Sequence, residues 1–205
     1  MLNPNPPSSV VTCNVETSTC ITNALDAALG VMAAGQCAMN NFTFGNNRFQ
    51  YGRAISGGSG TGGITDAKGK VVSGFNGTSL VQAHMTNSRL TDPEILDFRF
   101  PVQLESYEIR TNSGDTGKWH CGEGGVLNVR FLEAMTASIL SNGRKAGAFG
   151  VTSAGRAGGA KRGRVSDGRV ETLAHISQAY IQPGDVFAMH RLGRGGFYCS
   201  GPMKF

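Results

Sequence analysis

Glycine content is the feature that most constrains how this chain can fold. The 205 residues include 30 glycines, about twice the usual share of roughly 7%. Glycine weakens the interior of a helix or strand, but it permits tight turns and close approach between backbone segments. With only 16% charged residues, the composition argues against a helical bundle and predicts a loop-rich β or α+β protein. A single domain with a real hydrophobic core is the expected organisation at this length.

One helix is predicted near the N-terminus, after an extended proline-rich lead-in at residues 1–9. Asn14 is a possible N-cap, Glu16 lies in the first turn, and Gly35 is a plausible end. Apolar residues recur between them at helical spacing: Ile21, Leu25, Ala28, Leu29 and Met32. A second, short helical stretch is expected near Asp92–Asp97, with Thr91 or Asp92 as cap and Pro93 at the first helical position.

The other periodic segments alternate as strands do. Aromatic and polar residues alternate around an Asn-rich turn in residues 39–51, which predicts a hairpin. A half-buried strand is expected from Phe98, with Pro101 placing it at an edge or bulge and a shift in apolar parity indicating a β-bulge near Glu105–Ser106. Further strands are predicted at Val126–Leu132, Thr136–Leu140, Val170–Tyr180 and Val186–His190. The expected fold is therefore α+β, mainly antiparallel, with one N-terminal helix and long Gly-rich loops.

Charge and cysteine usage limit the function classes. Much of the net charge of +5 lies between Arg144 and Arg169, which is expected to be a basic surface loop. Nucleic-acid binding is disfavoured, because the run Lys161-Arg162-Gly163-Arg164 has no adjacent aromatic residue for base stacking. The five scattered cysteines form no C-x-x-C pair, which favours reduced thiols and a cytoplasmic location. The sequence shows no recognisable signal peptide or membrane-spanning segment.

Familiar catalytic motifs are missing or incomplete. Gly58-x-Gly60-x-x-Gly63 matches the dinucleotide fingerprint formally, but the residues that follow, 64–70, read as a turn and not as the required helix. The chain contains no phosphate-binding P-loop and no G-x-S-x-G elbow. The four histidines lack metal-ligand spacing, so no metal site is assigned. His120-Cys121 is best interpreted as a surface histidine beside a packed thiol.

Two polar regions are candidates for a site. The first runs from His84 to Arg110 and contains Thr86, Asn87 and Arg89. It is either a capped turn or a site in which Arg89 grips a carboxylate or phosphate and Asn87 orients a carbonyl. The second is the glycine loop 112–125, which includes Ser113 and Gly114. It is either an anion-binding nest or a long hairpin connection anchored by Trp119. The tract 57–63 is either a close backbone approach to a ligand or simply mobile.

Several long motifs, in order along the chain, resemble the hydantoinase B/5-oxoprolinase family, and most closely its 5-oxoprolinase branch. They are residues 14–18, 29–34, 39–46, 56–60, 84–110, 131–142 and 183–187. Together they cover nearly the whole chain, with a lead-in at 1–9 and the family region at 10–205. The resemblance implies the fold of the C-terminal part of a hydantoinase B-type domain.

The same resemblance implies a chemistry. Members of the family open a cyclic amide, and the oxoprolinase branch converts 5-oxoproline, ATP and water to glutamate, ADP and phosphate. One unit phosphorylates the amide oxygen and the B-type unit completes ring opening, which is sensible because phosphorylation turns the oxygen of a poor electrophile into a leaving group. The resemblance also implies an oligomeric assembly when the enzyme is complete. The candidate substrate-binding residues are Thr86, Asn87, Arg89, Gly58, Gly60, Ser113 and Gly114; no catalytic residue is assigned.

The resemblance also implies that this chain is incomplete. The His/Asp-rich segments expected to supply metal ligands in the family lie upstream of anything that aligns, so ATP and a divalent metal would be bound outside this chain. The expected partners are a hydantoinase A-type ATP-handling unit and the N-terminal part of the B-type unit, and we expect the chain alone to be inactive. The alternatives are a hydantoinase- or carboxylase-type relative, a non-catalytic remnant or interaction module, and a basic-loop binder of nucleic acid.

Overall fold

The structure is a computed structural model, and it describes residues 5–7, 13–35, 40–68, 71–81, 89–114, 118–141, 161–163 and 170–191. Within these ranges every strand pairing is antiparallel. A four-stranded sheet has the order β10-β7-β1-β2, a five-stranded sheet has the order β5-β6-β11-β8-β9, and β3 pairs with β4 alone. Helices α1 and α2 complete the described elements, so the predicted α+β, mainly antiparallel fold is confirmed.

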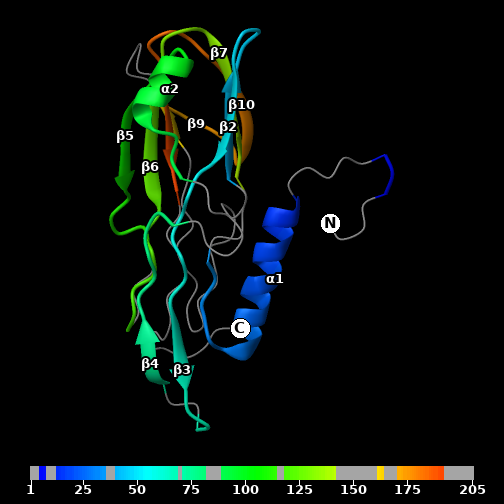
Figure 1. The fold of residues 1–205 in the computed structure, drawn as a ribbon, viewed down its shortest axis with the longest axis vertical. Coiled ribbons are helices and arrows are strands. Elements are labelled where there is room, and N and C mark those ends of the chain that lie inside the picture. The colour runs from blue at the N-terminus through cyan, green and yellow to red at the C-terminus, as the bar shows by residue number, and fades with distance from the viewer. Residues whose placement is uncertain are drawn as a thin grey trace.

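The two larger sheets pack face to face around an aromatic core. The four-stranded sheet consists of β1 (Asn41–Gly45), β2 (Gln50–Ala54), β7 (Met135–Leu140) and β10 (Ile176–Ile181). The Phe42 ring stacks on Phe187 of the other sheet at 5.1 Å, and Phe44 meets Phe131 edge to face at 5.3 Å. Such pairs add about 0.5–1.5 kcal/mol each beyond the area they bury. These contacts hold the two sheets together in the upper part of Figure 1.

The five-stranded sheet shows why most strand predictions hold. Its strands are β5 (Val102–Ile109), β6 (Gly125–Phe131), β8 (Lys161–Gly163), β9 (Val170–Thr172) and β11 (Val186–His190). In β6 every second residue is buried, the period of a strand with one face on a core. Strand β5 lies at the edge, and its register shifts between Leu104 and Ser106 opposite β6, which confirms the predicted bulge at Glu105.

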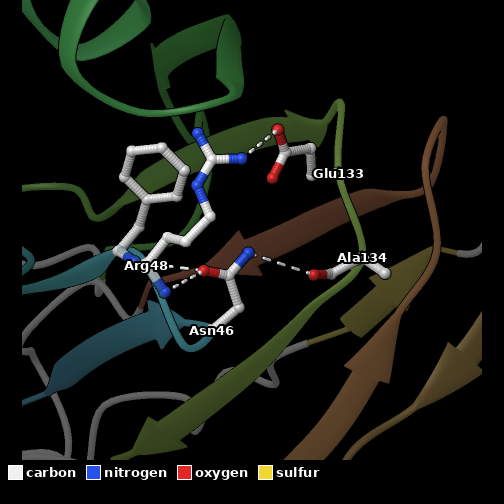
Figure 2. A network of polar contacts seen from close by, with 5 residues as sticks. Asn46, Arg48, Glu133 and Ala134 are labelled. Carbon is white, nitrogen blue, oxygen red and sulfur yellow. Dashed lines mark hydrogen bonds and ion pairs between the residues drawn. The ribbon is translucent and has the colours of Figure 1, made fainter.

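The hairpin β1–β2 is also as predicted, and its turn is tied to the connection between the two sheets. Asn46 Oδ1 accepts the backbone amides of Arg48 and Phe49 at 2.9 and 3.0 Å, and Asn46 Nδ2 donates to Ala134 O at 3.4 Å. Arg48 forms an ion pair with Glu133, with 3.6 Å between Nη1 and Oε1 (Figure 2). One asparagine therefore shapes the turn and anchors it to the β6–β7 connection.

Five predictions about local structure are wrong. Helix α1 runs Cys13–Leu29, so Asn14 lies inside it and not at the cap, and Gly30, with φ +65°, follows its end in place of Gly35. Helix α2 is Pro93–Arg99, so Phe98 is helical and 89% exposed, and the strand starts at Val102. The predicted strand Val170–Tyr180 is two strands, β9 and β10. Lys161–Gly163, expected in a basic loop, forms β8 between β11 and β9.

Candidate functional site

A layer of backbone-packed segments lies beyond the two large sheets and brings two predicted site regions together. We call residues 57–62, 76–80 and 120–125 the glycine layer. The Ser59 amide donates to Thr78 O at 3.0 Å, and the Gly122 amide donates to Ser59 O at 3.0 Å. The Gly77 amide donates to His120 O at 2.8 Å. The middle of each segment is thus hydrogen-bonded to another, although the three are far apart in sequence.

Several glycines of this layer are required by space. A β-carbon at Gly58 would overlap the Gly122 carbonyl, and one at Gly60 would overlap the Ala33 carbonyl. Each obstacle is backbone, which cannot swing aside as a long side chain can. In the structure the tract 57–63 makes its close approach to the protein's own backbone.

Ser113 and Gly114 contact the same segment from another direction. Ser113 Oγ accepts the Gly124 amide at 2.9 Å, and a β-carbon at Gly114 would lie 2.8 Å from Cys121 Sγ. The preceding residue, Asn112, has φ +59°, and its amide donates to Glu123 Oε1 at 2.6 Å. The structure thus places Gly58, Ser113 and Gly114 around one segment, residues 121–124, whereas Gly60 packs against the backbone of Ala33 and Ala34.

Three serines of this region share an arrangement that the sequence did not reveal. Ser59 Oγ accepts the Thr78 amide at 2.8 Å, Ser79 Oγ accepts the Glu123 amide at 3.0 Å, and Ser113 Oγ accepts the Gly124 amide. A hydroxyl that accepts an amide can still donate its own hydrogen. These serines are therefore suited to donate to ligand oxygens such as those of a carbonyl, carboxylate or phosphate. Ser59 and Ser79 were missed, and only the polar glycine run at residues 76–80 could have signalled the latter.

The backbone of Arg89 is anchored by β2 and not by the glycine layer. The Arg53 guanidinium on β2 donates from Nη2 to the Arg89 carbonyl at 2.7 Å, and Tyr51 Oη lies 2.9 Å from Thr91 Oγ1. The Arg89 side chain is exposed, and no ion pair to it is seen among the described residues. Thr86 and Asn87 lie outside the described residues. The described residues on either side are Val81, which bridges to Gly57, and Arg89, whose carbonyl accepts a hydrogen bond from Arg53.

The remaining features of these regions have structural roles. Asp92 caps α2 by accepting the Glu94 amide at 2.9 Å, and Pro93 occupies the start of the helix, as predicted. The Trp119 ring lies against Gly74 of β4, which confirms its role as a packing anchor. His120 is exposed and Cys121 is buried, as predicted. The residues after Gly63 form the hairpin of β3 (Gly62–Thr65) and β4 (Val71–Phe75), so no helix follows the formal dinucleotide motif.

The described residues contain neither a metal-binding cluster nor a membrane-spanning helix. No three His, Cys, Asp or Glu side chains lie close enough together there to hold a metal ion. The side chains of this part of the chain thus do not fit a divalent cation centre. No described helix is both long and apolar enough to cross a bilayer.

Comparison with known proteins defines the class. A sequence model of the family described as hydantoinase B/oxoprolinase matches residues 1–198, and the chain belongs to this family. It is 42% identical to a 5-oxoprolinase of Dictyostelium discoideum over 144 residues, covering 70% of this chain and 11% of that protein. It is 36% identical to 5-oxoprolinase 1 of Arabidopsis thaliana and 38% identical to the 5-oxoprolinase of Saccharomyces cerevisiae. Each of these two matches covers 96% of this chain, but only 15% and 16% of the relative.

Solved structures share the fold. An acetone carboxylase in a nucleotide-free state is similar with a TM-score of 0.60 at 15% identity, covering 82% of this chain and 26% of that chain. An ATP-dependent caprolactamase from Pseudomonas jessenii is similar with a TM-score of 0.53 at 19% identity, covering 96% and 36%. The chain thus spans a small fraction of its relatives.

Proposed function

We propose that this chain is the C-terminal part of the ring-opening unit of an ATP-dependent 5-oxoprolinase. The observation that carries the proposal is the sequence identity of 36–42% between this chain and three 5-oxoprolinases from different organisms. The complete enzyme would convert 5-oxoproline, ATP and water to glutamate, ADP and phosphate. The similarity to an enzyme named as an ATP-dependent caprolactamase supports lactam opening as the reaction type.

In this proposal the chain forms one wall of the substrate pocket. Arg89, with its exposed guanidinium, binds the substrate carboxylate or a phosphate, and the neighbouring Asn87 and Thr86 orient the lactam. Ser113 presents a hydroxyl, and Gly58, Gly60 and Gly114 allow the backbone arrangement that positions it. ATP and a divalent metal are bound by other parts of the enzyme, including a hydantoinase A-type unit.

The test is a chimera. The region of the S. cerevisiae 5-oxoprolinase that matches this chain would be replaced by the chain itself, and ATP-dependent release of glutamate from 5-oxoproline would be measured. We expect activity in the chimera and none in the isolated chain supplied with ATP and divalent metal. A chimera that folds and assembles but releases no glutamate contradicts the proposal. Ring opening of a hydantoin instead, or carboxylation of a ketone, would favour the corresponding alternative relative.

The role of Arg89 is tested in the same chimera. Arg89→Ala should raise the KM for 5-oxoproline at least tenfold, because a charge-assisted contact is worth about 1.5–3 kcal/mol. Arg89→Lys should restore part of the affinity. Arg99→Ala removes an exposed arginine in the last turn of α2 and is the matched control. Equal kinetics for Arg89→Ala and Arg99→Ala would show that Arg89 does not bind substrate.

A further inference from the structure

Helix α1 has its polar residues inside and its apolar residues outside. Thr19 and Asn23 are 4% and 2% exposed, whereas Ile21, Leu25 and Leu29 are 50%, 59% and 72% exposed. The other exposed residues between positions 20 and 29 are Cys20, Ala24, Ala27 and Ala28. No exposed residue in this span is charged. A helix at a water-facing surface normally shows the opposite pattern.

The hydrogen bonds on the buried side of α1 explain why polar residues lie there. Asn23 Oδ1 accepts the Gly35 amide at 3.1 Å, and Asn23 Nδ2 donates to the Gly35 carbonyl at 3.3 Å. The Asn23 side chain thus pairs with both the backbone amide and the backbone carbonyl of Gly35, as a neighbouring strand would. Thr19 Oγ1 bonds back to Glu16 O at 3.0 Å. The buried polar side chains are thus satisfied, and the apolar stripe is left on the outside.

The exposed apolar surface continues beyond the helix. Val31 is 41% exposed, and its carbonyl accepts the Gly63 amide of β3 at 2.9 Å. The Phe75 ring of β4 lies over Gly62, beside the same carbonyl, and Phe75 and Ile64 are also exposed. In Figure 1 α1 stands beside the sheets, with β3 and β4 at the lower end of the molecule. We call Ile21, Leu25, Leu29, Val31, Ile64 and Phe75 the apolar face. Exposed large apolar side chains gathered on neighbouring elements mark an interaction site.

We propose that the apolar face is the surface on which the rest of a hydantoinase B-type polypeptide packs, through an apolar helix laid along α1. The related 5-oxoprolinases carry more than four-fifths of their length outside the region that matches this chain, and the caprolactamase carries nearly two-thirds outside it. Ala24 and Ala28 lie one turn apart on the exposed side, and such small residues permit the close approach of a second helix. The only charged residue between positions 20 and 29 is the half-buried Asp26, which argues against a nucleic acid or a charged peptide as the occupant. The inference rests on the proposed membership of a larger ring-opening unit.

The test uses Cys20, an exposed thiol on the same side of α1. Its rate of alkylation by a maleimide would be followed by peptide mass spectrometry in the isolated chain and in the chimera with the S. cerevisiae enzyme. We expect at least tenfold slower labelling in the chimera. The double variant Leu25→Asp/Leu29→Asp should restore fast labelling in the chimera without lowering the melting temperature of the isolated chain. Ile176→Asp, on the outer face of β10 and 57% exposed, is the matched control and should leave Cys20 protected.

Equal labelling of Cys20 in the isolated chain and in the chimera would overturn the proposal. So would a stable dimer of the isolated chain that becomes monomeric in Leu25→Asp/Leu29→Asp, measured by light scattering, because the apolar face would then bind a second copy. The labelling of Cys20 is measured independently of catalytic activity. An inactive chimera with protected Cys20 therefore refutes the proposed reaction alone, and an active chimera with reactive Cys20 refutes the docking surface alone.

Discussion

At the scale of single residues, the space around each glycine shows whether the position requires a glycine or could hold a larger residue. Gly122 faces the Thr78 carbonyl and the Ser59 amide, with no room for a methyl group, whereas Gly52 on β2 faces only Thr43 Cγ2 at 3.2 Å. Neither residue has a positive φ, and composition does not distinguish the two. The difference depends on contacts between distant segments, which is why the sequence could predict many close approaches but not which glycines make them.

Gly122→Ala should therefore lower the free energy of unfolding by about 1–3 kcal/mol, because the added methyl overlaps backbone that has no rotamer to change. Gly52→Ala should change it by less than about 1 kcal/mol, since the Thr43 side chain can shift and alanine restricts the unfolded chain. Urea denaturation of the isolated chain measures both. Similar values for the two variants would mean that the glycine layer is not close-packed.

The Asn46 turn allows a second comparison. Asn46→Ala removes the acceptor of two amides and one contact to Ala134, and should cost about 1–2 kcal/mol. Glu133→Gln breaks the ion pair with Arg48, whose side chain is 70% exposed, and should cost less than about 0.5 kcal/mol. Melting temperatures of the two variants should differ in this order; a larger effect for Glu133→Gln would contradict it.

At the scale of elements, the sequence was most informative where a local rule and the burial pattern agree. Strands β6, β7 and β11, the β1–β2 hairpin, the bulge at Glu105 and the Asp92–Pro93 start of α2 were all predicted. Alternation failed at Phe98, because a capped helix takes precedence over an apolar pattern that extends into it. The helical period of α1 predicted the helix, but not that its apolar stripe would face outward, since periodicity does not tell which face meets a neighbour.

Asp92→Ala tests the cap of α2 and should destabilise the chain by about 1 kcal/mol. Asp92→Asn keeps an oxygen that can accept the Glu94 amide and should be nearly neutral. Equilibrium unfolding monitored by circular dichroism distinguishes the two. If both variants lose the same stability, the charge of Asp92 matters and the hydrogen bond does not.

At the scale of the whole molecule, stability should be uneven. The strands β1, β6, β7 and β11 surround the buried aromatic core, while β3 and β4 form a two-stranded ribbon with exposed Ile64 and Phe75. An isolated ribbon of two strands is marginally stable in water. The site predicted from the sequence was only partly assembled at this scale: the Gly58 and Ser113 regions meet, whereas Arg89 is fixed through β2, and Thr86 and Asn87 lie outside the described residues.

Amide hydrogen exchange should therefore be slowest in β1, β6, β7 and β11 and fastest in β3 and β4. In the chimera we expect exchange in β3–β4 and α1 to slow, because the apolar face becomes covered, while the core strands change little. Peptide-resolved mass spectrometry measures both states. Uniform protection across all strands of the isolated chain would contradict this distribution.

The glycine layer has a consequence for the order in which the chain folds. Its three segments come from distant parts of the sequence and gain little from hydrophobic burial. Bringing them together therefore costs loop-closure entropy, and the stabilising contacts form only once all three segments are in place. We expect the aromatic core to form in the folding transition state and the layer to close afterwards. Gly122→Ala should then accelerate unfolding while leaving the refolding rate nearly unchanged in stopped-flow experiments, whereas Phe131→Ala should slow refolding. Such a layer would open before the aromatic core under stress, so the part of the molecule that gathers Gly58 and Ser113 would have a shorter lifetime than the core.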